Sequence, residues 1–473
     1  MGHNRNEASA GKDTTVKRLR IGWYIVVAIF TLIWSSIAFS ENRLQEAKDA
    51  YENGEFDKAL SVLGPLAEEQ GVAEAEYLLG VMYFTGKGVP ADSTEAVKWH
   101  RLAAEQGHAG AQAGLGAMYH SGEGVSKDLG EAVKWFRLAA EQGHAGAQAY
   151  LGNIYGLGEG VSKDLEESVK WYRLAAEQGN ADAQTELGRK YLQGEGIPED
   201  SGEAAKWIQL AAEQGHAGAQ AYLGNMYGLG EGVSKDLEEA VKWYRLAAEQ
   251  GDSESQFRLG FMYANGNGVP KDFKEAIKWY QLAAEKGHNP AQFKLGLMYE
   301  NGQGVPKDFK EAIRWFKKAA EQGYIMAQNH LGIMYEEGKS VPKSFKEAIK
   351  WFQMAAEQDD IVAQNMLGFM FWFGEGQAAR INYKEAFKWY SRAAEQGDAG
   401  AQSSIGSFFE EGLGVKKNYV LAYMWYNLAA ADSKYYSREI AATARDTLEK
   451  RMTPEQIAEA QRLSSEWKPK TQK

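Results

Sequence analysis

Hydrophobic residues recur along this chain with a period of 36 residues. A Leu-Gly or Ile-Gly pair marks each period, and eight of the nine intervals between successive pairs span 36 residues. A tryptophan recurs in step with these pairs, from Trp99 to Trp425. Fixed periods of about 20 to 50 residues are typical of solenoids, in which each repeat buries its apolar face against its neighbours. The pattern therefore predicts an array of ten repeats. The pairs begin at Leu79, Leu115, Leu151, Leu187, Leu223, Leu259, Leu295, Leu331, Leu367 and Ile405.

Within each repeat, two stretches have the 3.6-residue spacing of helices. In the third repeat, Ala147, Leu151 and Ile154 fall on one side of a first helix, with Gly152 at its margin. Glycine inside a helix costs roughly 1 kcal/mol relative to alanine, so its return in every repeat predicts close approach of a neighbouring helix. A second stretch with helical spacing follows at residues 165–176. Each repeat is therefore predicted to be a pair of short antiparallel helices.

Polar residues and glycines mark the helix boundaries. Asp164 precedes the second helix and Glu167 follows three residues later, which is the pattern of a capping box. Nine repeats carry an equivalent Asp, Ser or Asn followed by Glu. Gly158 and Gly160 provide the turn between the helices, and Gly179 ends the second helix.

These recurring elements are Ala-x-x-x-Leu-Gly-x-Met/Ile-Tyr, Gly-x-Gly-Val, Asp-x-x-x-Ala-x-x-Trp and Ala-Ala-Glu-Gln-Gly. They resemble the Sel-like repeat family, a branch of the tetratricopeptide-repeat clan, over residues 73–433. The resemblance implies an all-α fold, a right-handed α-solenoid of antiparallel helix pairs that forms a tetratricopeptide-like superhelix and holds other proteins. The shared motif is structural, so it carries over no catalytic residue.

The ends of the array differ from its middle. Residues 41–72 resemble a plain tetratricopeptide unit that caps the N-terminal side, and residues 434–473 are predicted to form C-terminal capping helices and a tail. The last helix is expected to start with Thr453 as its N-cap and Pro454 at its first position.

The first 40 residues are unlike the repeats. Residues 1–20 form a basic region that contains Lys17, Arg18 and Arg20, and residues 21–40 contain no charged residue. Such a segment is long enough to span a bilayer as a helix, with its basic flank in the cytoplasm. We therefore predict either a retained transmembrane anchor or a signal peptide cleaved after Ser40. If the segment is retained, the chain is a single-pass protein of the bacterial inner membrane with its repeats in the periplasm. If the segment is cleaved, the chain is a periplasmic or secreted protein.

Composition narrows the classes of partner and chemistry. The formal net charge is -11. Phosphate binding requires clustered positive charge, so nucleic acid is not an expected partner. The chain contains no cysteine, which excludes disulfides, thiolate zinc sites and cysteine nucleophiles.

Three motifs resemble chemical signatures, and each has a structural interpretation. The Gly-x-Gly loops lack the strand and the Gly-Lys-Ser/Thr ending of a phosphate-binding loop. His108 and its equivalents in three other repeats follow the helix-stop glycine and are interpreted as surface-loop residues. Ser340 with Lys343, and Ser465 with Lys468, match the Ser-x-x-Lys motif of penicillin-recognising enzymes without its companion motifs. The sequence thus predicts no catalytic, cofactor-binding or metal-binding residue.

Partner binding is predicted where the repeats differ. The third and seventh positions of the first helix, counted from Ala147 in the third repeat, point away from its packed side. These positions are small or polar in early repeats, as at Ala149 and Asn153, and apolar in later ones. We expect an apolar groove there; the alternative is that curvature buries these side chains between repeats. The candidate partner-binding residues are Phe257, Phe261, Phe293, Leu297, Ile333, Phe369, Trp372 and Phe373.

These observations predict a non-enzymatic scaffold or adaptor that binds protein partners through the solenoid surface. Two alternatives stay open. Exposed aromatic residues are also typical of a protein that binds cell-wall glycan or peptidoglycan. The Ser-x-x-Lys matches are the basis of the second alternative, a β-lactamase-like or wall-active hydrolase. Membrane attachment through residues 21–40 applies if that segment is not cleaved.

Overall fold

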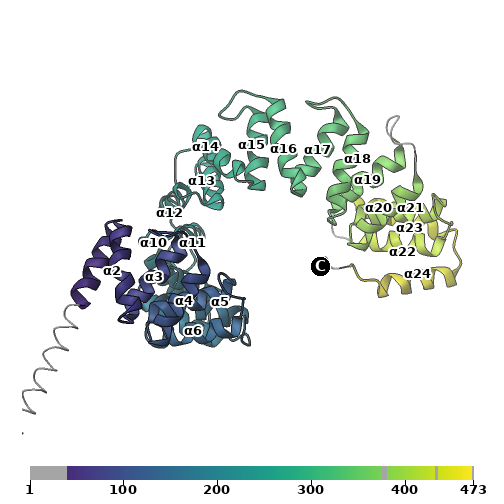
Figure 1. Cartoon of the computed structure of the whole chain (residues 1–473). Helices are drawn as coiled ribbons and strands as arrows, with labels where there is room; N and C mark the ends of the chain where they lie inside the picture. The colour runs from purple at the N-terminus through teal and green to yellow at the C-terminus, as the bar shows by residue number, and fades with distance from the viewer. Residues whose placement is uncertain (1–39, 375–380, 432–434, 471–473) are drawn as a thin grey trace, which may run out of the picture. The chain divides into compact units, whose positions relative to one another are not determined.

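The computed structural model describes residues 40–374, 381–431 and 435–470, with only the backbone described for 435–437. Every regular element in these ranges is an α-helix. The chain divides into two compact units, an N-terminal unit that ends at Lys235 and a C-terminal unit that begins at Asp236. Each unit is a row of paired antiparallel helices (Figure 1). The predicted all-α solenoid of helix pairs is confirmed.

The N-terminal unit begins with a helix over residues 40–52. It continues with α2 (Phe56–Glu68), α3 (Ala73–Thr85), α4 (Ser93–Glu105), α5 (Ala109–Ser121), α6 (Leu129–Glu141), α7 (Ala145–Leu157), α8 (Leu165–Glu177), α9 (Ala181–Gln193), α10 (Ser201–Glu213) and α11 (Ala217–Leu229). From α3 onwards, odd-numbered helices up to α21 are the first helices of their repeats and even-numbered helices up to α22 are the second.

The C-terminal unit contains α12 (Leu237–Glu249), α13 (Ser253–Asn265), α14 (Phe273–Glu285), α15 (Asn289–Asn301), α16 (Phe309–Glu321), α17 (Ile325–Glu337), α18 (Phe345–Ala356), α19 (Ile361–Phe373), α20 (Tyr383–Glu395), α21 (Ala399–Glu411), α22 (Tyr419–Ala431), α23 (Tyr435–Glu449) and α24 (Pro454–Glu466). As predicted, Thr453 caps α24 and Pro454 is its first residue.

The helix boundaries follow the local signals in the sequence. Asp164 accepts a hydrogen bond from the backbone N–H of Glu167 at the start of α8, and Gly158 ends α7 in the left-handed conformation at φ 79°. The predicted caps are therefore confirmed, but the Glu side chain does not return the bond: Glu167 pairs with Lys170 instead. Within the described residues, Thr453 and Gln456 form the one complete capping box.

The glycine of each Leu-Gly pair lies against a large side chain of the second helix in the same repeat. A Cβ atom added to Gly152 would lie 2.7 Å from the ring of Tyr172, and one added to Gly296 would lie 2.5 Å from the ring of Phe316. Side chains cannot pack at these distances without displacement of the ring. The predicted close approach is confirmed, and it allows a bulky residue to fill the space between the paired helices.

The second glycine of each Gly-x-Gly loop contacts the preceding repeat. A Cβ atom on Gly196 would lie 2.2 Å from the carbonyl oxygen of Leu165, at the start of the preceding second helix. In the eighth repeat, Ser340 replaces this glycine and keeps its left-handed backbone, with φ 68°. Its buried Oγ atom has no hydrogen-bond partner among the described residues. Serine at this position is therefore strained.

A chain of buried glutamine amides connects successive helices, and sequence reasoning did not anticipate it. Nε2 of Gln148 donates to the carbonyl oxygen of Ala140 in the preceding repeat over 3.0 Å, and Oε1 of Gln148 accepts from Nε2 of Gln178 at 2.6 Å. Buried polar groups are costly unless they are hydrogen-bonded, so this chain both satisfies the amides and links repeats. Equivalent amide pairs are Gln142–Gln112, Gln214–Gln184, Gln322–Gln292, Gln358–Gln328 and Gln396–Gln364.

The sixth repeat, residues 253–288, interrupts this chain. Lys286 occupies the position of the donating glutamine, and its Nζ atom donates to the carbonyl oxygen of Gly251 over 2.5 Å. Oε1 of the buried Gln256 is left without a hydrogen-bond partner among the described residues.

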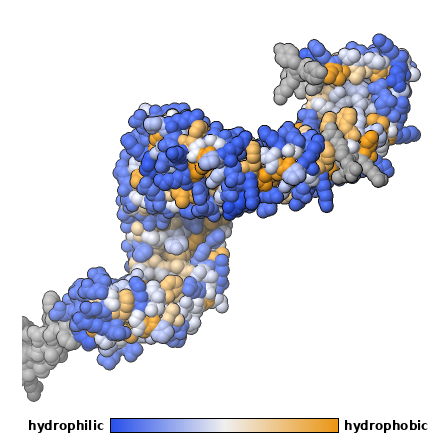
Figure 2. Space-filling model, turned by 90° about the horizontal axis from the view of Figure 1, so that it is seen from above, coloured by the Kyte–Doolittle hydropathy of each residue, from blue (hydrophilic) through white to orange (hydrophobic). Residues whose placement is uncertain are grey.

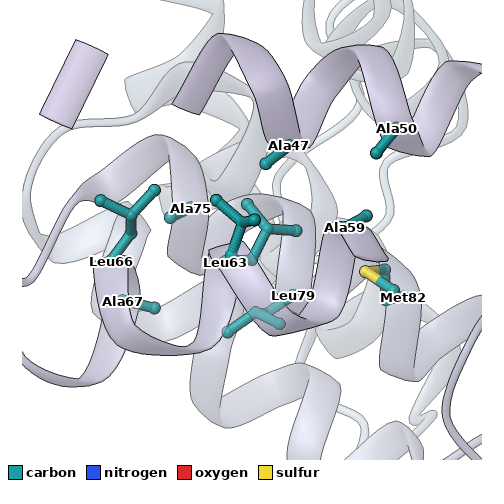
Figure 3. Packing of buried hydrophobic residues seen from close by; sticks show 10 residues of the cluster. Ala47, Ala50, Ala59, Leu63, Leu66, Ala67, Ala75, Leu79 and Met82 are labelled. Atoms are coloured by element: carbon teal, nitrogen blue, oxygen red, sulfur yellow. The ribbon is translucent and has the colours of Figure 1, made fainter. Parts of the chain in front are cut away.

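The N-terminal end of the array is closed by the helix over residues 40–52 and by α2. Ala47 and Ala50 of the first of these, Leu63 and Leu66 of α2, and Leu79 of α3 converge in one buried cluster (Figure 3). Side chains of this first helix and of α2 therefore cover the apolar face of α3 in the first repeat.

None of the described helices has the length and hydropathy needed to cross a membrane. The predicted basic region at 1–20 lies outside the described residues. So does the predicted anchor or signal segment at 21–40, except for Ser40.

We expect Gly296→Ala to lower stability, because the added methyl group collides with the buried Phe316 ring. Overpacking of this kind typically costs about 1 to 3 kcal/mol. Gly64→Ala in α2 is the matched control, since nothing lies within 4 Å of its added Cβ atom; it should raise stability by about 0.5 to 1 kcal/mol. Denaturant unfolding followed by circular dichroism measures both, and equal effects would contradict the steric explanation.

We expect Ser340→Gly to stabilise the chain by about 1 kcal/mol, because glycine adopts positive φ without strain. The reverse change one repeat earlier, Gly304→Ser, should destabilise it, because its Cβ atom would lie 2.7 Å from the backbone of Phe273. Thermal unfolding of both variants checks this pair, and a lower melting temperature for Ser340→Gly would show that Ser340 is not strained.

Candidate protein-binding surface

Half of the candidate residues form a row on the first helices of the C-terminal unit. Phe261 on α13, Leu297 on α15, Ile333 on α17 and Phe369 on α19 occupy the same position of four successive repeats. Phe261, Ile333 and Phe369 are 40%, 37% and 38% exposed, and Leu297 is half-buried. We call these four residues the apolar row.

The two phenylalanines at the third position behave differently. Phe293 is only 5% exposed, and its ring packs 5.5 Å from Phe316 and 5.6 Å from Tyr324. Phe257 is half-buried, 4.9 Å from the ring of His288. The expectation that this position faces solvent is wrong for Phe293, because Phe316 of the same repeat, Tyr324 at the start of α17 and His330 on α17 surround it. For this residue the alternative, burial between repeats, holds.

Trp372 and Phe373, at the end of α19, also have different environments. The half-buried Trp372 ring lies 4.6 Å from Phe408 in the following repeat. Phe373 is 57% exposed, and its ring lies 4.7 Å from Phe369. Phe373 therefore extends the apolar row at its C-terminal end, whereas Trp372 helps to join two repeats.

The same register in the N-terminal unit is polar in three successive repeats, at Asn153, Arg189 and Asn225. Arg189 forms an ion pair with Glu186 at 2.8 Å. Hydrophobic residues that reach the surface are interspersed with hydrophilic ones over the visible face of the molecule (Figure 2). The apolar row thus belongs to the sixth to ninth repeats and not to the repeat as such, since Ser407 holds the same position in the tenth.

Charged residues lie beside the row. Glu254 on α13 accepts from Arg258 at 2.6 Å and pairs with His288 at 3.0 Å. Burial raises the pKa of Glu254, but the hydrogen bonds from His288 and Arg258 outweigh it and lower the pKa overall. Glu300 pairs with His330 at 3.0 Å. These carboxylates are engaged with neighbouring side chains.

The histidines after the helix-stop glycines lie in the loops between helices, partly exposed, and each also caps the helix that follows. Nδ1 of His108 accepts from the backbone N–H of Ala111 at 3.1 Å, and its Nε2 atom pairs with Glu74 at 2.7 Å. Other repeats use Asn180 or Asp252 in the same role. Accepting this bond requires an unprotonated Nδ1. Equivalent histidine caps are His144, His216 and His288.

Neither serine of the two Ser-x-x-Lys matches is hydrogen-bonded to its lysine. The hydroxyl of Ser340 is buried without a partner among the described residues. The hydroxyl of Ser465 donates to the backbone carbonyl of Arg462 at 2.8 Å. Within the described ranges, no three His, Asp or Glu residues cluster so as to hold a metal ion.

His100 is a buried titratable side chain on α4 of the N-terminal unit. It is 4% exposed, and its Nδ1 atom has no hydrogen-bond partner among the described residues. Burial, with a smaller effect of His108, lowers the pKa of His100 from 6.5 to about 4. The equivalent residues in the next repeats are Phe136 and Tyr172, so His100 is a polar residue in an aromatic position.

Paired helices that recur at a fixed period and pack against their neighbours define an α-solenoid repeat protein. The Sel1 repeat model matches ten consecutive segments of the chain, and the chain therefore belongs to the Sel1 repeat family. The matched residues are 73–108, 109–144, 145–180, 181–216, 217–252, 253–288, 289–324, 325–360, 361–398 and 399–433.

Among solved structures, the chain is similar to a protective antigen present in uropathogenic Escherichia coli strains, which displays an SLR fold. The two are 36% identical with a TM-score of 0.68, over 90% of this chain and 91% of the antigen chain. The chain is also 37% identical to a Sel1 repeat protein from Oxalobacter formigenes, with a TM-score of 0.47, over 52% of this chain and 96% of that one. No curated protein matches the chain.

We expect His100→Phe to make the protein more resistant to acid. The pKa of His100 in the fold lies below its value in the unfolded chain, so the unfolded chain binds the proton first as pH falls. Above about pH 6.5 the imidazole is neutral in both states, and the stability associated with it is fully present. As pH falls from about 6.5 to about 4, the free energy of unfolding decreases by up to about 3 kcal/mol. Melting temperatures at about pH 7.5 and about pH 4.5 measure the difference. The explanation fails if both chains lose the same stability over this interval.

Proposed function

We propose that this protein is a non-enzymatic scaffold or adaptor whose C-terminal unit binds a segment of a partner protein along the apolar row. The observation that carries the proposal is the shared register of Phe261, Leu297, Ile333 and Phe369. Three of these side chains are more than a third exposed, at a register that holds Asn153, Arg189 and Asn225 in three successive repeats of the N-terminal unit. Contiguous exposed apolar side chains are typical of interaction surfaces.

The chemistry of the row favours a protein segment as the occupant. Its side chains recur with the repeat and are not gathered in one concave pocket, so they suit a ligand that carries apolar groups at intervals, as a helix or an extended strand does. Phe373 adds a further aromatic anchor beside Phe369. Aromatic side chains are among the residues that contribute most to binding energy at interfaces.

We further propose that the repeats act on the exported side of a bacterial membrane. The basic residues 17–20 and the uncharged segment 21–40 support this location. The similar Escherichia coli protein is a protective antigen, which agrees with exposure outside the cytoplasm. Fractionation of cells that produce the full chain distinguishes its forms: an anchored protein is found with membranes, and a cleaved one with the soluble periplasm. Recovery of the uncleaved chain from the cytoplasm would overturn this part of the proposal.

We expect Phe261→Ser combined with Phe369→Ser to weaken partner binding at least tenfold, because each change removes an aromatic anchor. The partner is first identified by photo-crosslinking from position 261 in the native envelope, then purified for titration. Leu246→Ser combined with Leu282→Ser is the matched control, since these leucines are 43% and 38% exposed but lie on second helices of the same unit.

Equal affinities of the two double variants, with both folded by circular dichroism, would contradict binding through the apolar row. Two assays address the other classes. Retention of the purified chain on peptidoglycan, lost in the Phe261 and Phe369 variant, would favour glycan binding. Turnover of nitrocefin or cleavage of peptidoglycan would overturn the non-enzymatic proposal.

A further inference from the structure

The second helices of the sixth to ninth repeats carry more positive charge than those of the first four. Counted from the residue before each N-cap, twelve-residue segments of the sixth to ninth repeats contain 14 Lys and Arg against six Asp and Glu. The same segments of the first four repeats contain nine against ten. The compared segments are 271–282, 307–318, 343–354 and 381–392 in the basic set, and 91–102, 127–138, 163–174 and 199–210 in the other. These second helices are therefore basic in the C-terminal unit and close to neutral in the N-terminal one.

One lysine recurs at the second position of these basic helices. It is exposed on α14, α16, α18 and α20, and on none of them does it form a salt bridge with a carboxylate of the described residues. Glu275 and Glu311, which follow it on α14 and α16, pair instead with Lys278 and Arg314. The recurring lysines, which we call the basic row, are Lys274, Lys310, Lys346 and Lys384.

A second lysine precedes three of these helices and lies over an aromatic ring. The Nζ atom of Lys271 is 4.7 Å from the centroid of the Phe273 ring, and that of Lys307 is 4.4 Å from the centroid of Phe309. The eighth repeat has the same arrangement at 4.6 Å. A contact of this kind orients a cation without neutralising its charge. These lysines are exposed, so their charge is available to a ligand beside the basic row.

The helix caps change in the same part of the chain. The second helices of the first seven repeats have Asp as N-cap, as Asp308 is for α16. Ser344 caps α18 and Asn382 caps α20. A helix N-terminus carries a partial positive charge, and a neutral cap does not offset it. The eighth and ninth repeats therefore keep the lysine of the basic row and lose the carboxylate two residues before it.

We propose that the basic row binds an acidic segment of a partner protein, in which Asp or Glu side chains pair with the lysines of successive repeats. The row recurs from helix to helix, so a polypeptide that runs along the stack places its carboxylates against separate lysines. The row is on second helices and the apolar row is on first helices, so this site goes beyond the function proposed above.

The charges between the lysines favour a protein segment over other anionic partners. Asp272 and Asp308 cap α14 and α16, and the carboxylates of Glu275 and Glu311 lie one residue beyond the lysines of the row. A nucleic acid or a bilayer surface presents closely spaced phosphates, which meet these carboxylates as well as the lysines. A peptide with spaced acidic residues pairs with the lysines and avoids the carboxylates.

The test titrates the full-length chain with fluorescently labelled peptides and measures anisotropy. The acidic probe is a peptide of alternating Glu and Gly residues, and the neutral probe has Gln in place of Glu. We expect saturable binding of the acidic probe at low salt and at least tenfold weaker binding of the neutral one. Salt screens exposed charges, so affinity for the acidic probe should fall as salt is added. Equal binding of the two probes, or binding that salt does not weaken, would overturn the proposal.

Removal of charge locates the site. The triple variant Lys274→Gln, Lys310→Gln and Lys346→Gln should bind the acidic probe at least tenfold more weakly, with unchanged circular dichroism because these side chains are exposed. Equal losses in this variant and in a matched control would show that net charge alone matters, and would contradict binding at the basic row. The control replaces three exposed, salt-bridged lysines of the N-terminal unit by Gln, namely Lys98, Lys134 and Lys206.

Glu238 offers a variant that should gain affinity. It holds the register of the basic row on α12, one repeat before Lys274. Glu238→Lys therefore lengthens the row by one repeat and should tighten binding of the acidic probe several-fold, which misfolding would not do. Unchanged or weaker binding would show that the row is not the site.

Two further arms identify the occupant and separate the two proposed surfaces. Vesicles of phosphatidylglycerol and a single-stranded DNA should bind more weakly than the acidic probe; tighter binding of either, lost in the triple Gln variant, would overturn a protein segment as the occupant. Phe261→Ser combined with Phe369→Ser should leave binding of the acidic probe unaltered. If these changes abolish it while the triple Gln variant binds normally, the peptide binds at the apolar row and the proposal for the basic row is wrong. If the acidic probe binds as expected but these changes leave partner binding intact, the proposal for the apolar row fails alone.

Discussion

The contact between the glycine of each Leu-Gly pair and the large side chain of the second helix determines the rest of the fold. Gly296 against Phe316 shows how little space is left: a single added carbon would lie 2.5 Å from the ring. This contact sets the separation of the two helices in a repeat. The second loop glycine then presses on the start of the preceding second helix, as Gly196 does on Leu165. Neither 13-residue helix would be stable alone, so the pair and its neighbours form a stable structure only together.

Local signals made most of this fold predictable from the sequence. Period, helix boundaries and caps depend on residues a few positions apart, which is why the Asp164 cap and the start of α24 at Pro454 were correctly placed. The environment of the third position was not predictable in this way. A helical wheel gives a direction around one helix, whereas the burial of Phe293 depends on Phe316 and Tyr324. The seventh position faces away from these neighbours, so Phe261 and Phe369 stay exposed as expected. Whether they bind a partner remains a prediction.

The sequence-based prediction missed mainly the polar residues that form hydrogen bonds inside the array. Gln148 and the histidine caps resemble surface residues in the sequence, because polarity by itself suggests contact with water. Gln148 can be buried because it donates to the carbonyl oxygen of Ala140, and the half-buried His144 accepts from the backbone N–H of Ala147. The signal was present in the Ala-Gln and Glu-Gln-Gly elements that recur with the period. Recurrence of a polar residue at a fixed register indicates an internal partner, whereas a departure from a recurring residue, such as Ser340, indicates local strain.

Lys286 in the sixth repeat changes how neighbouring helices are linked by hydrogen bonds. In a linear assembly, separation begins where the coupling between neighbours is weakest. Gln148 and its equivalents in the amide pairs named above hold two helices through both ends of the amide, but Gln256 holds only one, since Lys286 donates to Gly251 instead. A buried acceptor without a donor costs about 1 to 3 kcal/mol, and opening of the helix pair to water removes that cost. The amide chain is therefore interrupted at repeat six, which begins at α13, the helix that carries the first residue of the apolar row.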